Sequence, residues 1–517
     1  MILRRKISIG YGDLCPTSCT SLSTSGVALG IIQPIENPGE LKLVAVRHIT
    51  PSRASNVLLV ITGVVLVLAA VLLGWSAIIA EALNSQVPRI PLVAGSVGVG
   101  LLFVASAMCM KFVQPRWMLF WIVLVGAAAR LVLIPAPPVR QTDCLRYLWD
   151  GLVWTHGYNP WAQSPAAALS NKAAGLPAGL HTLAIRHRAL ISHINHRKLP
   201  TIYPPVSEAV FAIAAFMAPS STIMLKWWLV LFDAGTAVAI GLTLRHLRLP
   251  SGWLLLYWWN PMVINSFANE AHLDSIALFF VALFFLLLVS DCAIWACVAL
   301  GLAIGAKFWP LVFISIVIRK YWKYPKRLAA TLVALILSTC IALSPMLLTG
   351  PRAFISVQAY AHYWEANDLV FHLISHVWSG LMTSWFAAQR ASRMTVMVLY
   401  ALAVCGLMWR RPKDEIDLIK LGLWLTALIF LLSPTELPWY YTWLTPMLAL
   451  SPRLSILLWS CTLGLYHLSY IYPGLIWVEH APIILLFILE AFIPTLRWFP
   501  PVAPAVPATN PKLPGAL

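Results

Sequence analysis

Apolar stretches alternate with short polar segments along most of the chain. The first three, residues 57–79, 91–110 and 117–135, each approach the roughly 20 residues that a helix needs to cross a bilayer. Further apolar stretches lie at residues 222–244, 253–268, 274–290, 292–306, 308–318, 328–349, 392–409, 418–433, 438–450, 455–471 and 482–496. Because helices satisfy their own backbone hydrogen bonds in lipid, this pattern predicts an all-α, polytopic transmembrane bundle with about 12 to 14 spans. We detect no internal repeat.

The bundle is predicted to occupy residues 56–498. Residues 1–55 begin with MILRRK but have neither a compact apolar region nor a cleavage site, so we expect an irregular cytoplasmic tail, not a signal peptide. Residues 499–517 are proline-rich, which favours a disordered cytoplasmic tail. A polar stretch, residues 136–203, follows the third apolar stretch.

Composition strengthens the membrane interpretation. Charged residues make up 11% of the chain and hydrophobic residues 60%, whereas soluble domains contain about 25% charged residues. The formal net charge is +17. Its basic residues mostly lie between apolar stretches, as is typical of cytoplasmic loops, so nucleic acid is not an expected partner. The 9 cysteines have neither zinc-site nor disulfide spacing.

Basic clusters indicate how the spans are oriented. Those predicted to face the cytoplasm are at residues 245–248, 319–327, 410–413 and 452–453. Counting spans from these clusters places the N-terminus inside and residues 203–217 in a re-entrant or interfacial element. Four polar, aromatic-rich segments then share the outer face: residues 136–203, 269–274, 350–390 and 433–441. This distribution predicts a site that opens outward at the membrane surface.

The segment TDCLRYLWDGLVWTHG, residues 142–157, contains two of the 19 acidic residues. Thr142 suits the N-cap and Gly157 the C-terminal end of a short amphipathic helix, which we expect to lie along the interface. Asp143 and Asp150 are seven residues apart. They therefore share one helix face, about 10 Å apart along the axis, with Arg146 between them.

Two roles fit this pair of aspartates. Asp143 falls in the first helical turn, where the helix dipole favours an ionised carboxylate, and such a carboxylate can accept a proton from an attacking hydroxyl. Alternatively, both aspartates belong to a structural ion pair through Arg146. The residues alone favour neither role.

Two further outer segments carry candidate ligands. NEAHLDS places Glu270, His272 and Asp274 where two spans meet, and ionisable groups at membrane depth are usually functional. Lys307 in GAKFWP suits a phosphate as a point charge. Helix capping or hydrogen bonding is the structural alternative for the first three residues, and snorkelling is the alternative for the lysine.

Aromatic and polar side chains complete the candidate set, because they can stack on a sugar or hydrogen-bond to it. Aromatic residues also gather at every membrane interface, and a Tyr-Pro-Pro turn is commonly structural. These additional candidates for substrate binding are Tyr203, Trp364, Asn367, Glu436, Trp439 and Tyr440. The absence of P-loop, GxSxG, HExxH and CxxC patterns argues against ATP-driven transport and against serine or zinc hydrolysis.

Six segments in order resemble the polytopic GT-C glycosyltransferases. They are TDCLRYLWDGLVWTHGYNPW, TIYPP, WWNPMVINSFANEAHLDSIALFF, GAKFWP, YWEANDLVFHLIS and SPTELPWYYTWLTPML. The likeness is to bacterial mannosyltransferase-like membrane proteins and to the GPI mannosyltransferase I type. It covers residues from about 115 to about 450.

The resemblance implies a multi-pass enzyme, expected in a bacterial inner membrane, with its active site on the outer face. Such enzymes transfer a hexose, here expected to be mannose, with inversion from a polyprenyl-phosphate carrier to a hydroxyl of a glycan, glycolipid or protein. Their general base is an acidic residue in the first large outer loop, which corresponds to Asp143, with Asp150 as second choice. Lys307 or Arg146 would offset the leaving charge.

The chain departs from the family pattern in two places. Relatives often have His before Pro-Trp-Tyr where this chain has Leu437, so Glu436 is a candidate replacement. Asp143 is not part of an Asp-x-Asp pair, so no cofactor is predicted and a divalent cation stays an unsupported alternative. The competing functions are a transporter or flippase of a lipid-linked sugar and a structural membrane protein. A transporter should show repeat symmetry and a charged path at mid-membrane, neither of which is seen.

Overall fold

The computed structural model describes residues 53–110, 117–139, 141–170, 175–409 and 412–493. The tails expected at 1–55 and 499–517 lie outside the described residues, except for 53–55, which begin the first helix. Within the described ranges the chain is helical and forms no strand, apart from one isolated bridge between Ala366 and Thr435. The predicted all-α class is confirmed.

Six helices in the described part of the chain are long and apolar enough to cross a membrane, which confirms a multi-pass membrane protein. They are α1 (Arg53–Ala82), α2 (Arg89–Cys109), α9 (Thr222–His246), α15 (Pro325–Leu348), α18 (Trp385–Trp409) and α23 (Leu475–Phe492). Shorter helices of the bundle are α3 (Met118–Leu133), α10 (Leu255–Trp258), α11 (Pro261–Ile264), α12 (Asp274–Val289), α13 (Ala293–Ala306), α14 (Ile314–Tyr321), α19 (Glu415–Leu432), α20 (Thr445–Leu450), α21 (Leu454–Thr462) and α22 (Tyr466–Ser469).

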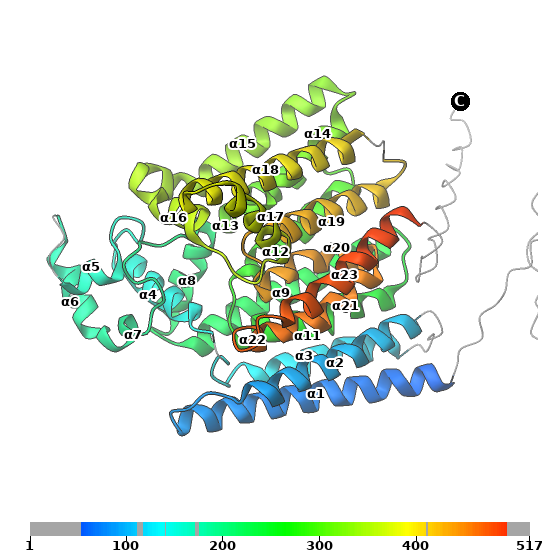
Figure 1. The fold of residues 1–517 in the computed structure, drawn as a ribbon, viewed down its shortest axis with the longest axis horizontal. Coiled ribbons are helices and arrows are strands. Elements are labelled where there is room, and N and C mark those ends of the chain that lie inside the picture. Colours follow the sequence, from blue (N-terminus) through cyan, green and yellow to red (C-terminus); the bar gives the residue numbers. More distant parts are fainter. Residues whose placement is uncertain (1–52, 111–116, 140, 171–174, 410–411, 494–517) are drawn as a thin grey trace, which may run out of the picture. The chain divides into compact units, whose positions relative to one another are not determined.

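Seven further α-helices complete the described part of the chain. They are α4 (Asp143–Thr155), α5 (Pro165–Ser170), α6 (Ala178–Arg186), α7 (Arg188–Ser192), α8 (Pro205–Met217), α16 (Ile355–Tyr363) and α17 (Leu369–Leu381). In Figure 1 the long helices run roughly side by side, and α4 to α7 gather at their left-hand end. Among the bundle helices, α1 packs on α2 and α3, while α12 packs on α9 and α13.

Three apolar stretches that we predicted as continuous spans are broken by proline. In residues 253–268, Pro261 starts α11 after Asn260, whose Oδ1 accepts from the Met262 N–H at 3.0 Å, and a π-helical turn, η3 (Asn265–Asn269), follows. Residues 308–318 divide into η4 (Trp309–Phe313) and α14, and residues 438–450 into η6 (Pro438–Leu444) and α20. Proline lacks an N–H and clashes with the preceding turn, which explains these breaks.

A buried ion pair joins three of the bundle helices. The Arg130 side chain, on α3, lies 2.5 Å from Asp233, on α9, and also donates to the Trp258 carbonyl at the end of α10 at 2.8 Å. The Tyr257 hydroxyl donates to Asp233 at 2.6 Å. Because every partner is hydrogen-bonded, the pair locks this junction instead of leaving a charge alone in the interior.

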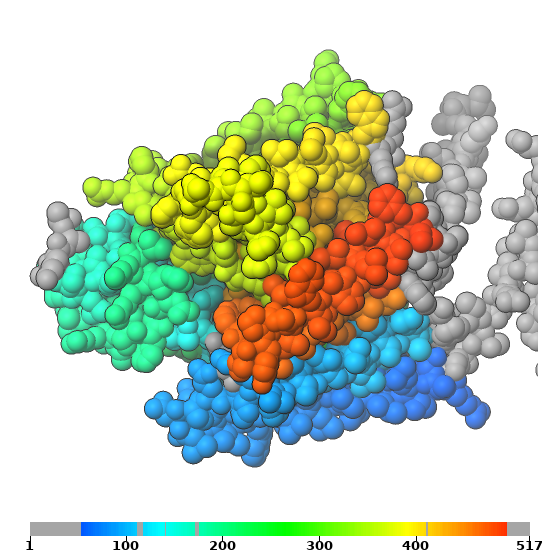
Figure 2. Space-filling model, in the orientation of Figure 1, coloured from blue at the N-terminus to red at the C-terminus, as the bar shows by residue number. Residues whose placement is uncertain are grey.

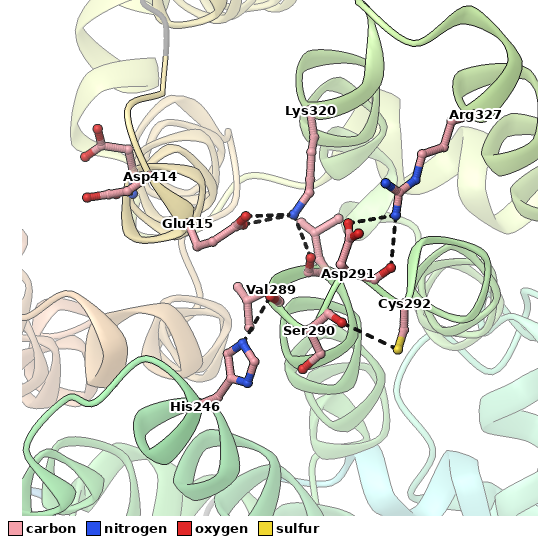
Figure 3. A network of polar contacts seen from close by, with 11 residues as sticks. His246, Val289, Ser290, Asp291, Cys292, Lys320, Arg327, Asp414 and Glu415 are labelled. Carbon is pink, nitrogen blue, oxygen red and sulfur yellow. Dashed lines mark hydrogen bonds and ion pairs between the residues drawn. The ribbon is translucent and has the colours of Figure 1, made fainter. Parts of the chain in front are cut away.

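A second polar network lies at the far end of α12 (Figure 3). Lys320 Nζ donates to Glu415 at 2.9 Å and to the Leu288 carbonyl at 2.7 Å, while Arg327 pairs with Asp291 at 2.7 Å. These contacts connect the ends of α12, α14, α15 and α19. Ion pairs that are partly exposed therefore hold these four helix ends together.

Helix α4 packs closely against α8 because Gly151 has no side chain. A Cβ atom at Gly151 would lie 2.4 Å from the Phe211 carbonyl oxygen, closer than a real contact allows. At Gly406, on α18, a Cβ would meet no atom within 4 Å. The two glycines therefore form a matched pair for testing this packing.

We expect Gly151→Ala to lower the free energy of unfolding by about 1–3 kcal/mol, because α4 has to move away from the α8 backbone. Gly406→Ala should leave stability unchanged or raise it by up to about 1 kcal/mol. Thermal unfolding of the purified proteins in detergent measures both effects. Equal melting temperatures for the two variants would contradict the close α4–α8 contact.

Candidate active site

The helix expected at residues 142–157 is present as α4, and Gly157 adopts the left-handed conformation at its end, with φ of 78°. Thr142 occupies the N-cap position but makes no side-chain capping bond. Its hydroxyl instead accepts from Asn195 Nδ2 at 2.8 Å. The start of α4 is thereby tied to the segment that follows α7.

Of the two aspartates that share a helix face with it, Arg146 pairs with Asp150. Arg146 Nε lies 2.9 Å from Asp150 Oδ2, and Nη2 donates to the Leu199 carbonyl at 2.7 Å. Asp150 is almost fully buried, and this burial raises its pKa although Arg146 acts in the opposite direction. Thr201 donates at 2.6 Å to Glu208, a buried carboxyl group that sequence reasoning missed. Its burial and its ion pair with Arg146 favour a structural role for Asp150.

A cavity of about 910 Å³ opens beside the start of α4. This is within the usual size of a small-molecule site, about 300–1,000 Å³. It brings together eight of the residues predicted from the sequence, which come from segments far apart in the chain. They are Asp143, Arg146, Tyr203, Asp274, Lys307, Trp364, Trp439 and Tyr440.

Lys307 enters this cavity from the end of α13 as a held cation. Its Nζ donates to Asp274 Oδ1 at 2.5 Å and lies 4.4 Å from the centre of the Tyr440 ring. Asp274, in the first turn of α12, also accepts from Trp443 Nε1 at 2.5 Å. Burial lowers the pKa of Lys307, and the adjacent Asp274 counteracts that effect. The lysine therefore offers a positioned positive charge to a ligand.

Aromatic rings form much of the cavity wall. The Tyr440 and Trp443 rings stack with centres 4.4 Å apart, and the Tyr440 hydroxyl lies 3.2 Å from that of Tyr360. At the opening, the His196 ring lies 4.4 Å from the Trp364 ring. Such faces suit the apolar sides of a sugar ring.

Five predicted site residues do not line the cavity: Asp150, described above, and four others. His272 is fully buried, stacks on Trp439 with ring centres 4.2 Å apart, and lies 3.3 Å from Glu270. Asn367 donates to Glu479 at 2.6 Å, and Glu436 lies 3.1 Å from His480. These residues support the cavity wall from behind.

Sequence reasoning missed the partners of this supporting layer. Glu479 and His480 are buried polar residues of α23, and Lys226 is a fully buried residue of α9. Lys226 interrupts the apolar stretch at 222–244, whereas Glu479 and His480 lie just before the stretch at 482–496. The interruption by Lys226 is itself a usable signal, because ionisable residues inside a span are costly.

An apolar groove of about 530 Å³ adjoins the cavity. Helices α1 and α2 contribute part of its wall, with Leu73 and Leu92 among the lining residues. Gln141 and Trp439 line both the groove and the cavity, so the two spaces share a border. Glu270 lines only the groove.

In the described ranges, no group of three or more His, Cys, Asp or Glu side chains is arranged to hold a metal ion. Two of the acidic side chains that line the cavity, Asp274 and Glu365, are bound to protein partners. Asp274 accepts from Lys307, and Glu365 pairs with Arg393 at 3.1 Å.

The model of glycosyltransferase family 87 matches residues 201–434. The match supports a membrane glycosyltransferase. It covers somewhat less than half of the chain and includes Tyr203, Asp274 and Lys307, whereas Asp143 precedes it and Trp439 follows it. No curated protein and no solved structure matches the chain. The family 87 match therefore supports the class of enzyme, while the roles of the individual residues stay predictions.

A buried carboxyl group beside the cavity wall provides a pH-dependent stability test. Asp368 precedes α17 and is 9% exposed; burial, together with nearby Glu365, raises its pKa to about 7, while Arg393 opposes this. Glu436 also faces this carboxyl group. Since the folded state favours the neutral acid, the stability it contributes is complete below about pH 4 and is lost as the pH rises to about 7.

We expect Asp368→Asn to raise the melting temperature little near pH 4 and progressively more up to about pH 7, with no further increase above that. The corresponding gain in the free energy of unfolding should reach at most about 4 kcal/mol. Thermal unfolding of both proteins in detergent across this pH range measures it. A difference that is constant with pH would show that Asp368 is ionised in the fold.

Proposed function

We propose that this protein transfers a hexose, expected to be mannose, from a polyprenyl-phosphate carrier to a hydroxyl acceptor with inversion at the outer face of the membrane. It would do so as a GT-C type enzyme of a bacterial inner membrane. One observation carries the proposal. A carboxylate, Asp143, and a held cation, Lys307, open into the same cavity, and that cavity borders an apolar groove.

Asp143 acts as the general base in this reaction. Its carboxylate accepts the proton of the acceptor hydroxyl as the hydroxyl oxygen attacks C1 of the sugar. The new C1–O bond forms on the face opposite the phosphate, and the old C1–O bond breaks with its electron pair going to the phosphate oxygen. The acceptor proton ends on Asp143, so charge and atoms balance.

Lys307 stabilises the departing phosphate. Its ammonium group is already oriented by Asp274 and the Tyr440 ring, so little reorganisation is needed as negative charge develops. Arg146 also lines the cavity, although its guanidinium is engaged with Asp150 and Leu199. Lys307 is also paired, with Asp274, but an ammonium group has three N–H donors and can bind a phosphate as well. We assign the phosphate to Lys307 and a positioning role to Arg146.

The apolar groove supports a lipid-borne donor. A polyprenyl chain needs a dry surface that starts beside the phosphate site, and the groove begins where Gln141 and Trp439 end the cavity. Its walls on α1 and α2 bury apolar chain atoms at roughly 25 cal/mol per Å². A nucleotide sugar would have no use for this surface.

A transporter of lipid-linked sugars is the alternative, and the gathering of the candidate site residues at one end of the bundle disfavours it. The cluster at the far end of α12 consists of partly exposed ion pairs, Lys320–Glu415 and Arg327–Asp291, and contains no residue that lines the cavity (Figure 3). The cavity lies instead beside the start of α12, at the opposite end of that helix.

Asp143→Asn is expected to reduce transfer by about 10²–10⁴-fold, because the amide cannot take the acceptor proton. The assay uses purified protein with polyprenyl-phosphate-mannose and a panel of hydroxyl acceptors, and it also measures donor binding, which should persist. Asp291→Asn, which removes a carboxylate at the other end of the bundle, serves as the control and should transfer normally. Undiminished turnover in Asp143→Asn would eliminate Asp143 as the base.

Lys307→Gln should weaken donor binding and slow transfer together, by about 10–100-fold, because the phosphate loses its positive partner. Lys307→Arg retains the charge and should keep a larger share of activity. The double variant Lys307→Gln/Asp274→Asn controls for the carboxylate left unpaired. If the double variant regained normal donor affinity, Lys307 would not contact the phosphate.

A further inference from the structure

The chain from Gly151 to Ser207 contains no acidic residue, although it includes several cations and five histidines. Four of its cationic side chains are exposed on α6, α7 and the segment that follows them: Arg186, Arg188, Arg197 and Lys198. We call these four residues the basic rim. Figure 2 shows the region, coloured cyan to green, projecting beyond the long helices.

The side chains of the basic rim have no carboxylate partner in the part of the chain that the structure describes. Among the described residues, no ion pair includes any of its four side chains. At the other end of the bundle, by contrast, Lys320 and Arg327 each have a carboxylate partner. An unbalanced positive field is thus concentrated in one part of the surface, where it attracts anions.

Two members of the basic rim, Arg197 and Lys198, adjoin the cavity. Asn195, His196 and Leu199 line the cavity, and Arg197 and Lys198 lie between these lining residues in the chain. This wall is fixed from several sides, because Arg146 donates to the Leu199 carbonyl and Asn195 donates to Thr142. A molecule that reaches Asp143 through the mouth of the cavity therefore passes beside this part of the rim.

We infer that the basic rim binds negatively charged groups of the acceptor, so that the acceptor is an anionic glycan or glycolipid carrying phosphate or carboxylate groups. This inference rests on the proposed function. The phosphate of the donor has its own cation in Lys307, held inside the cavity by Asp274. The rim is therefore available to the acceptor, and arginine side chains match phosphate and carboxylate oxygens with two parallel hydrogen bonds.

The aromatic mouth agrees with a glycan acceptor. The His196 and Trp364 rings lie 4.4 Å apart at the opening, directly beside Arg197, and offer apolar faces to a sugar. A sugar there with a charged substituent would contact ring and cation at once. The rings and the cation together would favour an acceptor whose charged group is separate from the hydroxyl that reacts.

The test compares three octyl mannobioside probes: a neutral one, a phosphorylated one, and one whose substituent is a carboxylate. The rim variant carries Arg186→Gln, Arg188→Gln, Arg197→Gln and Lys198→Gln, and the matched control carries Arg186→Lys, Arg188→Lys and Arg197→Lys. All proteins are assayed in nanodiscs of zwitterionic lipid with polyprenyl-phosphate-mannose. Binding of each probe is also measured without donor.

We expect the wild type to have a lower KM for at least one charged probe than for the neutral probe. The rim variant should raise the KM of that charged probe by about tenfold and leave its kcat unchanged. The KM of the neutral probe and of the donor should not change, and the lysine control should behave like the wild type. About 500 mM salt in place of about 50 mM should abolish the preference. The carboxylate probe separates a phosphate site from a general anion site.

Equal KM values for neutral and charged probes in the wild type, or an equal loss on all probes in the rim variant, would overturn the inference. A charge effect that appears only when anionic lipid is added to the nanodiscs would also overturn it, because the rim would then bind lipid headgroups. If the charged probe binds through the rim but no mannose is transferred, the proposed function fails while the inference about anion binding survives.

Discussion

The backbone at the end of α3 has to leave its helix inside the bundle, and the position of the candidate active site depends on how its polar groups are satisfied. Lys226 Nζ donates to the Ala136 carbonyl at 2.5 Å, and Asn269 both accepts from the Val139 N–H at 3.0 Å and donates to the Pro137 carbonyl at 3.2 Å. In an interior without water, each of these backbone groups would cost about 2–7 kcal/mol if it had no hydrogen-bond partner. The chain that reaches α4 is therefore held by α9 and by the π-helical turn before α12.

The same turn also governs the other half of the cavity. Its last residues lead through Ala271, which has a φ of 57°, to Asp274 at the start of α12. A residue with a side chain is strained in this conformation, and such strain persists only where surrounding contacts enforce it. Here the stacking of His272 on Trp439 supplies one such contact. The positions of Asp143 on α4 and of Lys307 at the end of α13 therefore both depend on the backbone of this π-helical turn.

Local chemistry explains what the sequence could predict. The helix that carries Asp143 and the contact between Arg146 and Asp150 depend on residues only a few positions apart. Lys307 stands out because it is a single polar residue among apolar ones. The contacts of Glu436 and Asn367 could not be predicted, because Glu479 and His480 lie more than 40 residues further along the chain. Proline also broke spans that length and hydropathy alone describe as continuous. The groove depends on how α1 and α2 pack, which periodicity does not encode.

Trp439 belongs at once to the wall of the cavity and to the wall of the groove, and it is held rigid by His272 on one side and Tyr440 on the other. In evolutionary terms this is a pleiotropic position. A substitution that reshapes the space for the sugar also reshapes the space for the carrier tail, so the two preferences cannot drift independently through this residue. Divergence in one of them is more accessible through residues that border a single compartment, such as Trp364 or Leu92.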